Sequence, residues 1–181
     1  MNFDKFSGLN VLVTGADGFI PSFVCDRLVE LNSNVTALVR RNSSNVIKSI
    51  PHLKNHVKIR WGDMTDLSLL IQETKEIDVI YHLGAQSHVQ YSLHNPLETY
   101  VTNSVGTANV LEAARINDVK KVVHAGSAEV YGKPNKVPIT EDNELVPRSP
   151  YAAAKVGSDR LMFSYYCTYG MPVVMSRFFG I

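Results

Sequence analysis

Leu9-Asn10-Val11-Leu12-Val13-Thr14-Gly15-Ala16-Asp17-Gly18 predicts a short buried strand that ends in a glycine turn. An amphipathic stretch from Phe19 to Leu31 follows and predicts a helix. A glycine turn that opens a helix lets backbone N–H groups approach a pyrophosphate, whose negative charge the helix N-terminus favours. Any tight strand-to-helix connection would show part of this pattern. We expect a dinucleotide site, with the residues Thr14, Gly15, Asp17, Gly18, Phe19 and Ile20.

Pro21 departs from the usual form of such a turn, which carries a third glycine at that position. A proline is tolerated in the first helical turn because its missing N–H would have no intrahelical partner there. The lost glycine normally allows close packing of helix on strand. We therefore expect a slightly displaced helix that still binds the dinucleotide.

The second predicted strand, Asn34 to Val39, ends in Arg40-Arg41-Asn42-Ser43-Ser44. In a dinucleotide fold this strand end meets the adenosine ribose, where an acid binds the 2′-hydroxyl and arginine accommodates a 2′-phosphate. Because there are two arginines and no acid, Arg40 and Arg41 favour NADP(H) over NAD(H). A solvated basic loop is the alternative.

Two further strands are predicted at Val57 to Trp61 and at Asp78 to Leu83, with a helix at Leu67 to Thr74 between them. Asp63, beside Met64, is placed to bond the adenine amino group, or else lies in the N-cap region of the helix. After the fourth strand, small residues let the cofactor approach the backbone. These expectations add Asp63, Met64, Leu83, Gly84 and Ala85 to the cofactor site.

The remaining chain predicts a long helix over 96–115, a fifth strand at Lys121 to Ala125, a proline-containing loop from Lys133 to Arg148, a helix over 151–169 and a sixth strand at Pro172 to Ser176. The architecture is then one NAD(P)-binding domain over residues 1–181, an α/β Rossmann-like doubly wound parallel sheet in three αβα layers. Ser127 follows the fifth strand, where ligands bind in such sheets.

Tyr151 and Lys155 are four residues apart, so both side chains lie on one face of the predicted helix. A phenol that acts as a base near neutrality needs its pKa lowered by roughly three units, or about 4 kcal/mol. An ammonium about 4 Å away supplies this at an effective dielectric of about 20, but only about 1 kcal/mol in bulk water. The pair is therefore catalytic only in a desolvated cleft; otherwise it is a surface tyrosine beside a lysine.

Composition narrows the class of protein. The net charge of +1 is spread without a basic block, which predicts no nucleic-acid or anionic-membrane partner. No apolar run reaches the length of a membrane span and residues 1–8 lack the apolar centre of a signal peptide, so we expect a cytoplasmic protein. Cys25, Cys167 and the histidines show no metal-ligand spacing, which predicts buried reduced thiols and no metal.

Several motifs occur together in one order and spacing: Thr14-Gly15-x-x-Gly18, Gly62-Asp63, Asn103-x-x-Gly106-Thr107, Ser127 and Tyr151-x-x-x-Lys155. In these the chain resembles the extended short-chain dehydrogenase/reductases, the nucleotide-sugar epimerases and dehydratases, over essentially its whole length. Three stretches are most similar to the GDP-mannose 4,6-dehydratases: Val39-Arg40-Arg41 with the serines that follow, Leu83 to Val89, and Pro147 to Tyr151. This resemblance also implies NADP(H).

The resemblance implies a site and a reaction. Tyr151, assisted by Lys155, removes the proton of the sugar 4-hydroxyl while Ser127 holds that hydroxyl, and Glu129 removes the C5 proton before water leaves from C6. Asn103, Tyr151 and Lys155 are expected in the cofactor site, and Gln86, Ser87 and His88 join Ser127 and Glu129 in the substrate site. Ala128 stands where these dehydratases carry a polar residue, and Glu129 also occurs at this place in nucleotide-sugar decarboxylases, so a 4-epimerase or a decarboxylase stays open as an alternative.

The resemblance also implies that this chain belongs to a longer enzyme. Members of the family continue past the sixth strand into a substrate-binding segment, so we expect residues 1–181 to be part of a longer enzyme that lacks most of this segment. A non-catalytic NADP(H)-binding module is the alternative of another class. A homodimer is expected through helices 96–115 and 151–169. The aromatic cluster Phe163, Tyr165, Tyr166 and Tyr169 is expected in the core or at that subunit interface.

Overall fold

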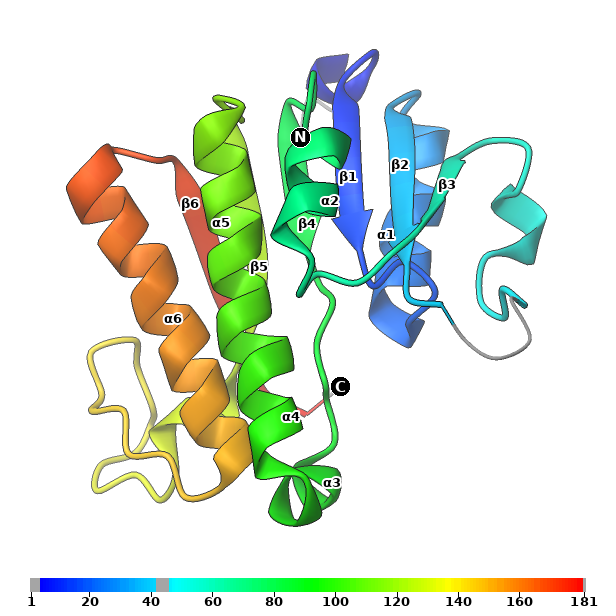
Figure 1. Cartoon of the computed structure of the whole chain (residues 1–181). Coiled ribbons are helices and arrows are strands. Elements are labelled where there is room, and N and C mark those ends of the chain that lie inside the picture. Colours follow the sequence, from blue (N-terminus) through cyan, green and yellow to red (C-terminus); the bar gives the residue numbers. More distant parts are fainter. Residues whose placement is uncertain (1–3, 42–45, 181) are drawn as a thin grey trace.

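The computed structural model describes residues 4–41 and 46–180. Its six strands form one parallel sheet in the order β3-β2-β1-β4-β5-β6 (Figure 1). The strands are β1 (Asn10–Thr14), β2 (Asn34–Val39), β3 (Lys58–Trp61), β4 (Val79–His82), β5 (Lys121–Ser127) and β6 (Val173–Phe178). The chain direction across the sheet reverses between β1 and β4, which opens a ligand crevice at their carboxyl ends. The predicted doubly wound sheet is confirmed.

The helices are α1 (Phe19–Glu30), α2 (Leu67–Glu73), α3 (Val89–His94), α4 (Pro96–Tyr100), α5 (Gly106–Ile116) and α6 (Pro150–Tyr169). Shorter turns complete the chain: η1 (Asp4–Phe6), η2 (Pro51–Leu53), the π-helical η3 (Val101–Val105) and η4 (Ala128–Tyr131). Among the helices of residues 4–41 and 46–180, none combines the length and the apolar character needed to cross a bilayer.

Alternating strand residues build two cores, one on each face of the sheet. Leu12, Ile80 and Val122 are buried with residues of α2, α5 and α6. Val11 and Val13 point the other way and are buried with residues of α1 and η2. Figure 1 shows α2, α5 and α6 in front of the sheet and α1 behind it. This is the expected αβα layering.

Pro21 lies in the first turn of α1, which runs through it without a break. Pro21 is buried, and a Cβ added at Gly18 would lie 3.3 Å from its Cδ atom. The proline is thus accommodated where its missing N–H has no helical partner. The displacement of the helix stays a prediction.

The structure adds two features to the sequence prediction. The helix predicted over 96–115 is present as the continuous run of α4, η3 and α5, and its middle part η3, which carries Asn103, is a π turn. The short helix α3 was not predicted, and it forms where the Ser92 hydroxyl accepts a hydrogen bond from the Tyr151 N–H at 3.1 Å. Both features depend on contacts between distant parts of the chain, which a local pattern does not contain.

The two cysteines differ in exposure. Cys25 is buried as predicted, and burial together with the neighbouring Asp26 charge raises the pKa of its thiol to about 12. Cys167 is exposed, so the prediction of two buried thiols was wrong. It lies in the last turns of α6, where Tyr166 and Tyr169 are also exposed.

Candidate active site

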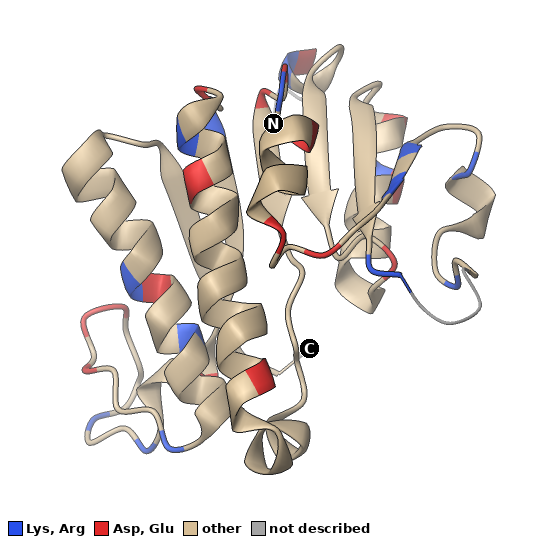
Figure 2. Cartoon of the chain, in the orientation of Figure 1, with Lys and Arg blue, Asp and Glu red and all other residues tan. Residues whose placement is uncertain are grey.

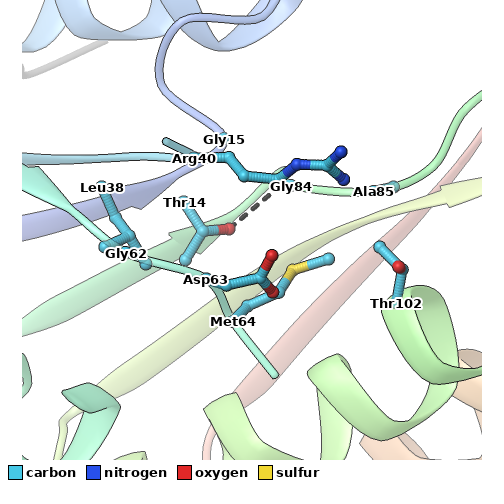
Figure 3. A pocket seen from close by; sticks show the side chains of 10 residues that line it. All are labelled: Thr14, Gly15, Leu38, Arg40, Gly62, Asp63, Met64, Gly84, Ala85 and Thr102. Carbon is cyan, nitrogen blue, oxygen red and sulfur yellow. Dashed lines mark hydrogen bonds between the residues drawn. The ribbon is translucent and has the colours of Figure 1, made fainter. Parts of the chain in front are cut away.

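A narrow pocket lies at the carboxyl ends of β1 to β4 (Figure 3). It brings together seven residues that the sequence predicted for the cofactor site: Thr14, Gly15, Arg40, Asp63, Met64, Gly84 and Ala85. Leu38, Gly62 and Thr102 also line it and were not predicted. Thr102 comes from the π turn, so only the folding of η3 against the sheet shows its place.

Thr14 and Gly15 join the ends of β1 and β4. The Thr14 hydroxyl oxygen accepts hydrogen bonds from the N–H groups of Leu83 at 3.2 Å and of Gly84 at 3.0 Å. Gly15 has a φ of +67°, and a Cβ there would lie 2.6 Å from the Gly84 Cα. Both the backbone conformation and the contact therefore require glycine. The floor of the pocket is backbone without side chains.

Helix α1 begins beside this floor. Its N-cap is Gly18, and no side chain among the described residues caps it, so the first-turn N–H groups keep their capacity to bind an anion. The side chain of Phe19 is exposed and packs edge-on against Phe23. Only the backbone of Phe19 is therefore placed for a phosphate.

Asp17 was predicted to bind the cofactor, but its carboxylate faces another segment. It accepts hydrogen bonds from the N–H groups of Lys48 at 2.9 Å and Ser49 at 2.6 Å. The Ser49 hydroxyl in turn donates to the Asp17 carbonyl at 2.8 Å. Asp17 fixes the glycine turn to the connection between β2 and β3, and a direct cofactor contact stays a prediction.

Arg40 and Asp63, both expected at the adenosine of the cofactor, line this pocket (Figure 3). One carboxylate oxygen of Asp63 accepts from the Thr65 N–H at 2.9 Å, while Asp66 is the residue that caps α2, through a bond from the Leu69 N–H at 3.0 Å. Arg41 is exposed and does not line the pocket. Asn42, Ser43 and Ser44, which the prediction placed after Arg41, lie outside the described residues.

Asn103 is buried in the π turn, with 2% of its surface exposed. Its side-chain oxygen accepts from the Gln86 N–H at 2.8 Å and its amide nitrogen donates to the Gln86 carbonyl at 2.9 Å. Asn103 therefore positions the backbone that follows β4. A direct contact of Asn103 with the cofactor stays a prediction.

A second pocket of ≈ 560 Å³ lies at the ends of β4, β5 and β6. This volume falls within the roughly 300–1,000 Å³ of small-molecule sites. Ala85 lines both pockets, so they are parts of one crevice. Eight predicted site residues meet in the second pocket: Ile20, Leu83, Ala85, Ser87, Ser127, Glu129, Tyr151 and Lys155. Gln86 and His88 do not line it.

Tyr151 enters this pocket from the first turn of α6, which Ser149 caps by accepting a bond from the Ala152 N–H at 3.1 Å. The phenol is 8% exposed and hydrogen bonded to Ser127. Burial raises the pKa of Tyr151, the bond to Ser127 lowers it in part, and the Glu129 charge raises it further. The Lys155 ammonium donates to the Ala125 carbonyl in this structure, and its assistance to Tyr151 stays a prediction.

Lys155 is 4% exposed, and its ammonium donates to the Ala125 carbonyl at 2.9 Å. Burial lowers the pKa of Lys155 to about 8. Below it lie the buried rings of His82 and His124, stacked with centroids 4.8 Å apart. His82 also bonds the Thr14 hydroxyl at 2.9 Å, so this stack connects the two pockets.

Several lining residues of the second pocket escaped the sequence analysis. Gly132, Ile139, Phe178, Phe179 and Gly180 line it beside the predicted residues. Ile139 belongs to the connection between β5 and α6 and Phe178 ends β6, and neither position has a local motif. Within the described part of the chain, no three His, Cys, Asp or Glu side chains are grouped to hold a metal ion.

Comparison with known proteins agrees with this arrangement. A family model described as GDP-mannose 4,6 dehydratase matches residues 12–180. The chain is 37% identical to the GDP-mannose 4,6-dehydratase of Yersinia enterocolitica over 88% of this chain and 46% of that protein. It is 32% identical to a putative UDP-glucose 4-epimerase of Methanocaldococcus jannaschii over 94% of this chain and 55% of that protein. The chain thus spans about half the length of the curated relatives it matches.

A solved structure shows the same fold. The dTDP-glucose 4,6-dehydratase DesIV of Streptomyces venezuelae, with NAD and TYD bound, superposes with a TM-score of 0.84 at 34% identity. The match covers 93% of this chain and 55% of that one. With its matched length, its parallel sheet and its Ser-Glu-Tyr-Lys pocket, the chain belongs to the GDP-mannose 4,6-dehydratase family, among the nucleotide-sugar dehydratases and epimerases of the short-chain dehydrogenase/reductase type.

Proposed function

We propose that this chain is the cofactor-binding and catalytic part of a nucleotide-sugar 4,6-dehydratase that uses NADP(H) and resembles GDP-mannose 4,6-dehydratase. The proposal rests on one observation. A single pocket is lined by Ser127, Glu129, Tyr151 and Lys155, and this pocket shares Ala85 with the pocket lined by Gly15 and Gly84. A pure binding module has no need of a buried tyrosine and lysine beside a carboxylate.

The crevice fits a dinucleotide. Gly15 and Gly84 have no side chains, so the backbone at the bottom of the pocket stays open to a ligand. The N–H groups at the uncapped start of α1 can bind a pyrophosphate. Asp63 would bind the adenine, and Arg40 with Arg41 the 2′-phosphate that distinguishes NADP. When bound, the oxidised nicotinamide supplies a hydride acceptor and a positive charge that favours the Tyr151 phenolate.

Tyr151 and Ser127 act first. Both side chains line the second pocket, where Ser127 would hold the sugar 4-hydroxyl while that hydroxyl gives its proton to Tyr151. The hydrogen on C4 leaves as hydride, and C4 becomes a ketone. Lys155, one helical turn along α6, contributes the positive charge that balances the phenolate.

Glu129 acts second. The new ketone acidifies the C5 proton, and the Glu129 carboxylate takes it, after which the C6 hydroxyl leaves as water. A hydride returned to C6 and a proton returned to C5 by Glu129 would complete the 4-keto-6-deoxy sugar, so that one water molecule is lost overall and no net oxidation remains. Tyr151, Glu129 or a solvent molecule protonates the leaving group, because Ala128 carries no acid.

Ala128 also supports a second candidate. It lines the pocket with a methyl group, so this position has no acid to protonate the leaving C6 hydroxyl. Oxidation at C4 can then be followed by reduction at C4 with inverted configuration instead of loss of water. That reaction defines a 4-epimerase, the activity named for the Methanocaldococcus jannaschii relative. A decarboxylase of the family is the other enzymatic alternative.

Product analysis of Glu129→Gln separates these functions. The longer enzyme that contains this chain, and its Glu129→Gln variant, are incubated with NADP⁺ and GDP-mannose, and products are identified by NMR. We expect the wild type to form the 4-keto-6-deoxy sugar, and Glu129→Gln to keep cofactor binding and partial oxidation at C4 but to lose that product. Glu144→Gln, at an exposed position of the connection before α6, is the control. An epimerised sugar from the wild type would establish the second candidate instead.

We also propose that the protein is a homodimer and that a further segment completes the substrate site. The exposed aromatic side chains of α6, Phe163, Tyr166 and Tyr169, support a subunit interface, and Figure 2 shows long uncharged stretches on α5 and α6. Val174 of β6 is 49% exposed, which supports a segment that packs on this edge of the sheet. Sedimentation velocity of Tyr166→Asp tests the interface, with a shift to monomer as the expected result.

A further inference from the structure

Arg177 lies at the junction of four segments around the catalytic pocket. From β6 its guanidinium donates to the Asp159 carboxylate of α6, with Nε 2.8 Å from Oδ2 and Nη2 3.3 Å from Oδ1. Nη1 donates to the Tyr131 hydroxyl of η4 at 2.7 Å and to the Glu141 carbonyl at 3.1 Å. One side chain therefore joins β6, α6, η4 and the connection before α6.

The junction is buried and compensated in charge. The side chains of Asp159 and Arg177 are 1% and 14% exposed, and Arg160 is a second partner of Asp159. The Arg177 guanidinium also lies 5.2 Å from the centroid of the Tyr131 ring. Buried charge pairs of this kind contribute little net stability. Their hydrogen bonds instead hold the connected segments in one relative orientation.

Tyr131 connects this junction to Glu129. Both lie in the single turn η4, which begins where the Ser127 hydroxyl accepts from the Glu129 N–H at 3.2 Å. The turn ends at Gly132, whose φ is +57° and where a Cβ would lie 1.9 Å from the Val146 carbonyl oxygen. The orientation of Glu129 thus depends on the two ends of η4, and Arg177 holds the second end through Tyr131.

We infer that Arg177, with Asp159 as its counter-charge, is a positioning residue that holds the η4 turn so that Glu129 faces the substrate. This inference rests on the proposed role of Glu129 as the base at C5. Arg177 touches neither pocket, and its effect passes through Tyr131. The planar guanidinium is required because it bonds a carboxylate, a hydroxyl and a carbonyl at once, which an ammonium cannot do in the same plane.

Tyr131→Phe is the sharpest test, because it removes one hydroxyl and keeps the ring. Tyr165→Phe is the matched control: that hydroxyl also bonds a charged side chain, Glu112, at 3.1 Å, but it lies away from the pocket. Arg177→Lys, which keeps the charge and loses the planar fork, is the second variant. Two measurements are made on each variant: hydrogen–deuterium exchange over residues 128–148, and the kinetics of dehydration.

We expect Tyr131→Phe and Arg177→Lys to raise exchange over 128–148 about tenfold, as loss of one hydrogen bond to a charged group predicts. We expect kcat for dehydration to fall about tenfold with unchanged NADP⁺ affinity and unchanged C4 oxidation, which is followed as transient absorbance of the reduced cofactor. Tyr165→Phe changes neither measurement.

Exchange over 128–148 that matches the Tyr165→Phe control would overturn the inference, and so would raised exchange with unchanged dehydration. If the wild type dehydrates no nucleotide sugar, the proposed function fails. The exchange experiment then still decides whether Arg177 holds the turn, because it needs no substrate.

Discussion

The two pockets of the crevice are built by opposite means, and we name them by the roles proposed above: the cofactor end beside Gly15 and the catalytic end beside Tyr151. At the cofactor end the surface is backbone, and the essential feature is the absence of side chains where Gly15 meets Gly84. At the catalytic end the surface consists of buried polar side chains, above all Tyr151 and Lys155, which a hydrogen bond and a helix hold in place. Substitutions should therefore act sterically at the first end and chemically at the second.

The largest effect is expected from Lys155→Met at the catalytic end. The substitution removes the charge that balances the Tyr151 phenolate but keeps a long apolar stem, so turnover should fall about a thousandfold while NADP⁺ affinity changes far less. Steady-state kinetics and calorimetric titration with NADP⁺ measure the two quantities. Lys120→Met, which removes a surface lysine paired with Asp78, should leave both unchanged. Equal losses of turnover and affinity would show that the two ends are not separate.

Gly15→Ala tests the cofactor end. The added Cβ meets the Gly84 Cα at 2.6 Å and the backbone φ is +67°, so the two backbones must separate and NADP⁺ affinity should fall about a hundredfold. Gly8→Ala is a matched control, because Gly8 has a φ of +76° but no atom lies within 4 Å of its Cβ position. Calorimetric titration of both variants separates contact from backbone strain. Equal losses in the two would mean that strain alone acts.

The two ends also differ in how far the sequence predicts them. The glycine turn, the strands and the Tyr151 helix follow from local patterns, and Thr14, Gly15, Asp63 and Tyr151 lie where these patterns placed them. Asp17 was predicted from its place in the motif, yet its carboxylate binds the backbone of Lys48 and Ser49. A local pattern gives the position of a residue along an element, but not the distant partner that competes for its side chain.

The catalytic end shows the same limit more strongly. Tyr151 and Lys155 are neighbours on one helix, so their pairing was expected from spacing alone. The bond from Lys155 to Ala125 and the junction at Arg177 depend on how β5 and β6 pack against α6, and no motif marks them. Burial raises the pKa of Tyr151, whereas the expected catalytic role requires a lowered one, so the role of Tyr151 as a base stays a prediction.

The histidine stack that connects the two ends gives a pH dependence. Burial and the Lys155 charge lower the pKa of His124 from 6.5 to about 3, although the hydrogen bond of His124 to the His82 backbone acts in the opposite direction. Between these values the unfolded chain binds a proton and the folded chain does not, so stability falls as the pH is lowered below 6.5. When the pH is lowered from 7 to 5, this residue should decrease the free energy of unfolding by about 2 kcal/mol.

His124→Phe should remove that contribution, so its unfolding free energy should fall less than that of the wild type between pH 7 and pH 5. Urea denaturation at the two pH values measures the difference. His82 is unchanged in both proteins, and burial lowers its pKa as well, so the remaining pH dependence is shared. Parallel losses of stability in the two proteins would contradict the lowered pKa of His124.

The smallest effect concerns the adenosine side of the cofactor end, where charge rather than shape is expected to act. Arg40 and Asp63 line the same pocket (Figure 3). Both arginines are exposed, but Arg41 does not line this pocket. Arg40→Ser should lower the preference for NADP⁺ over NAD⁺ about tenfold, because it removes a charge-assisted bond to the 2′-phosphate and leaves the glycine floor intact. Arg41→Ser is the matched comparison and should have a smaller effect. Titration of each variant with both dinucleotides measures the ratio of the two affinities.

If Arg41→Ser has the larger effect, the phosphate is bound from the loop after β2 rather than from the pocket. If neither variant changes the ratio, the two arginines belong to a solvated basic loop, and the cofactor end selects its dinucleotide by shape alone.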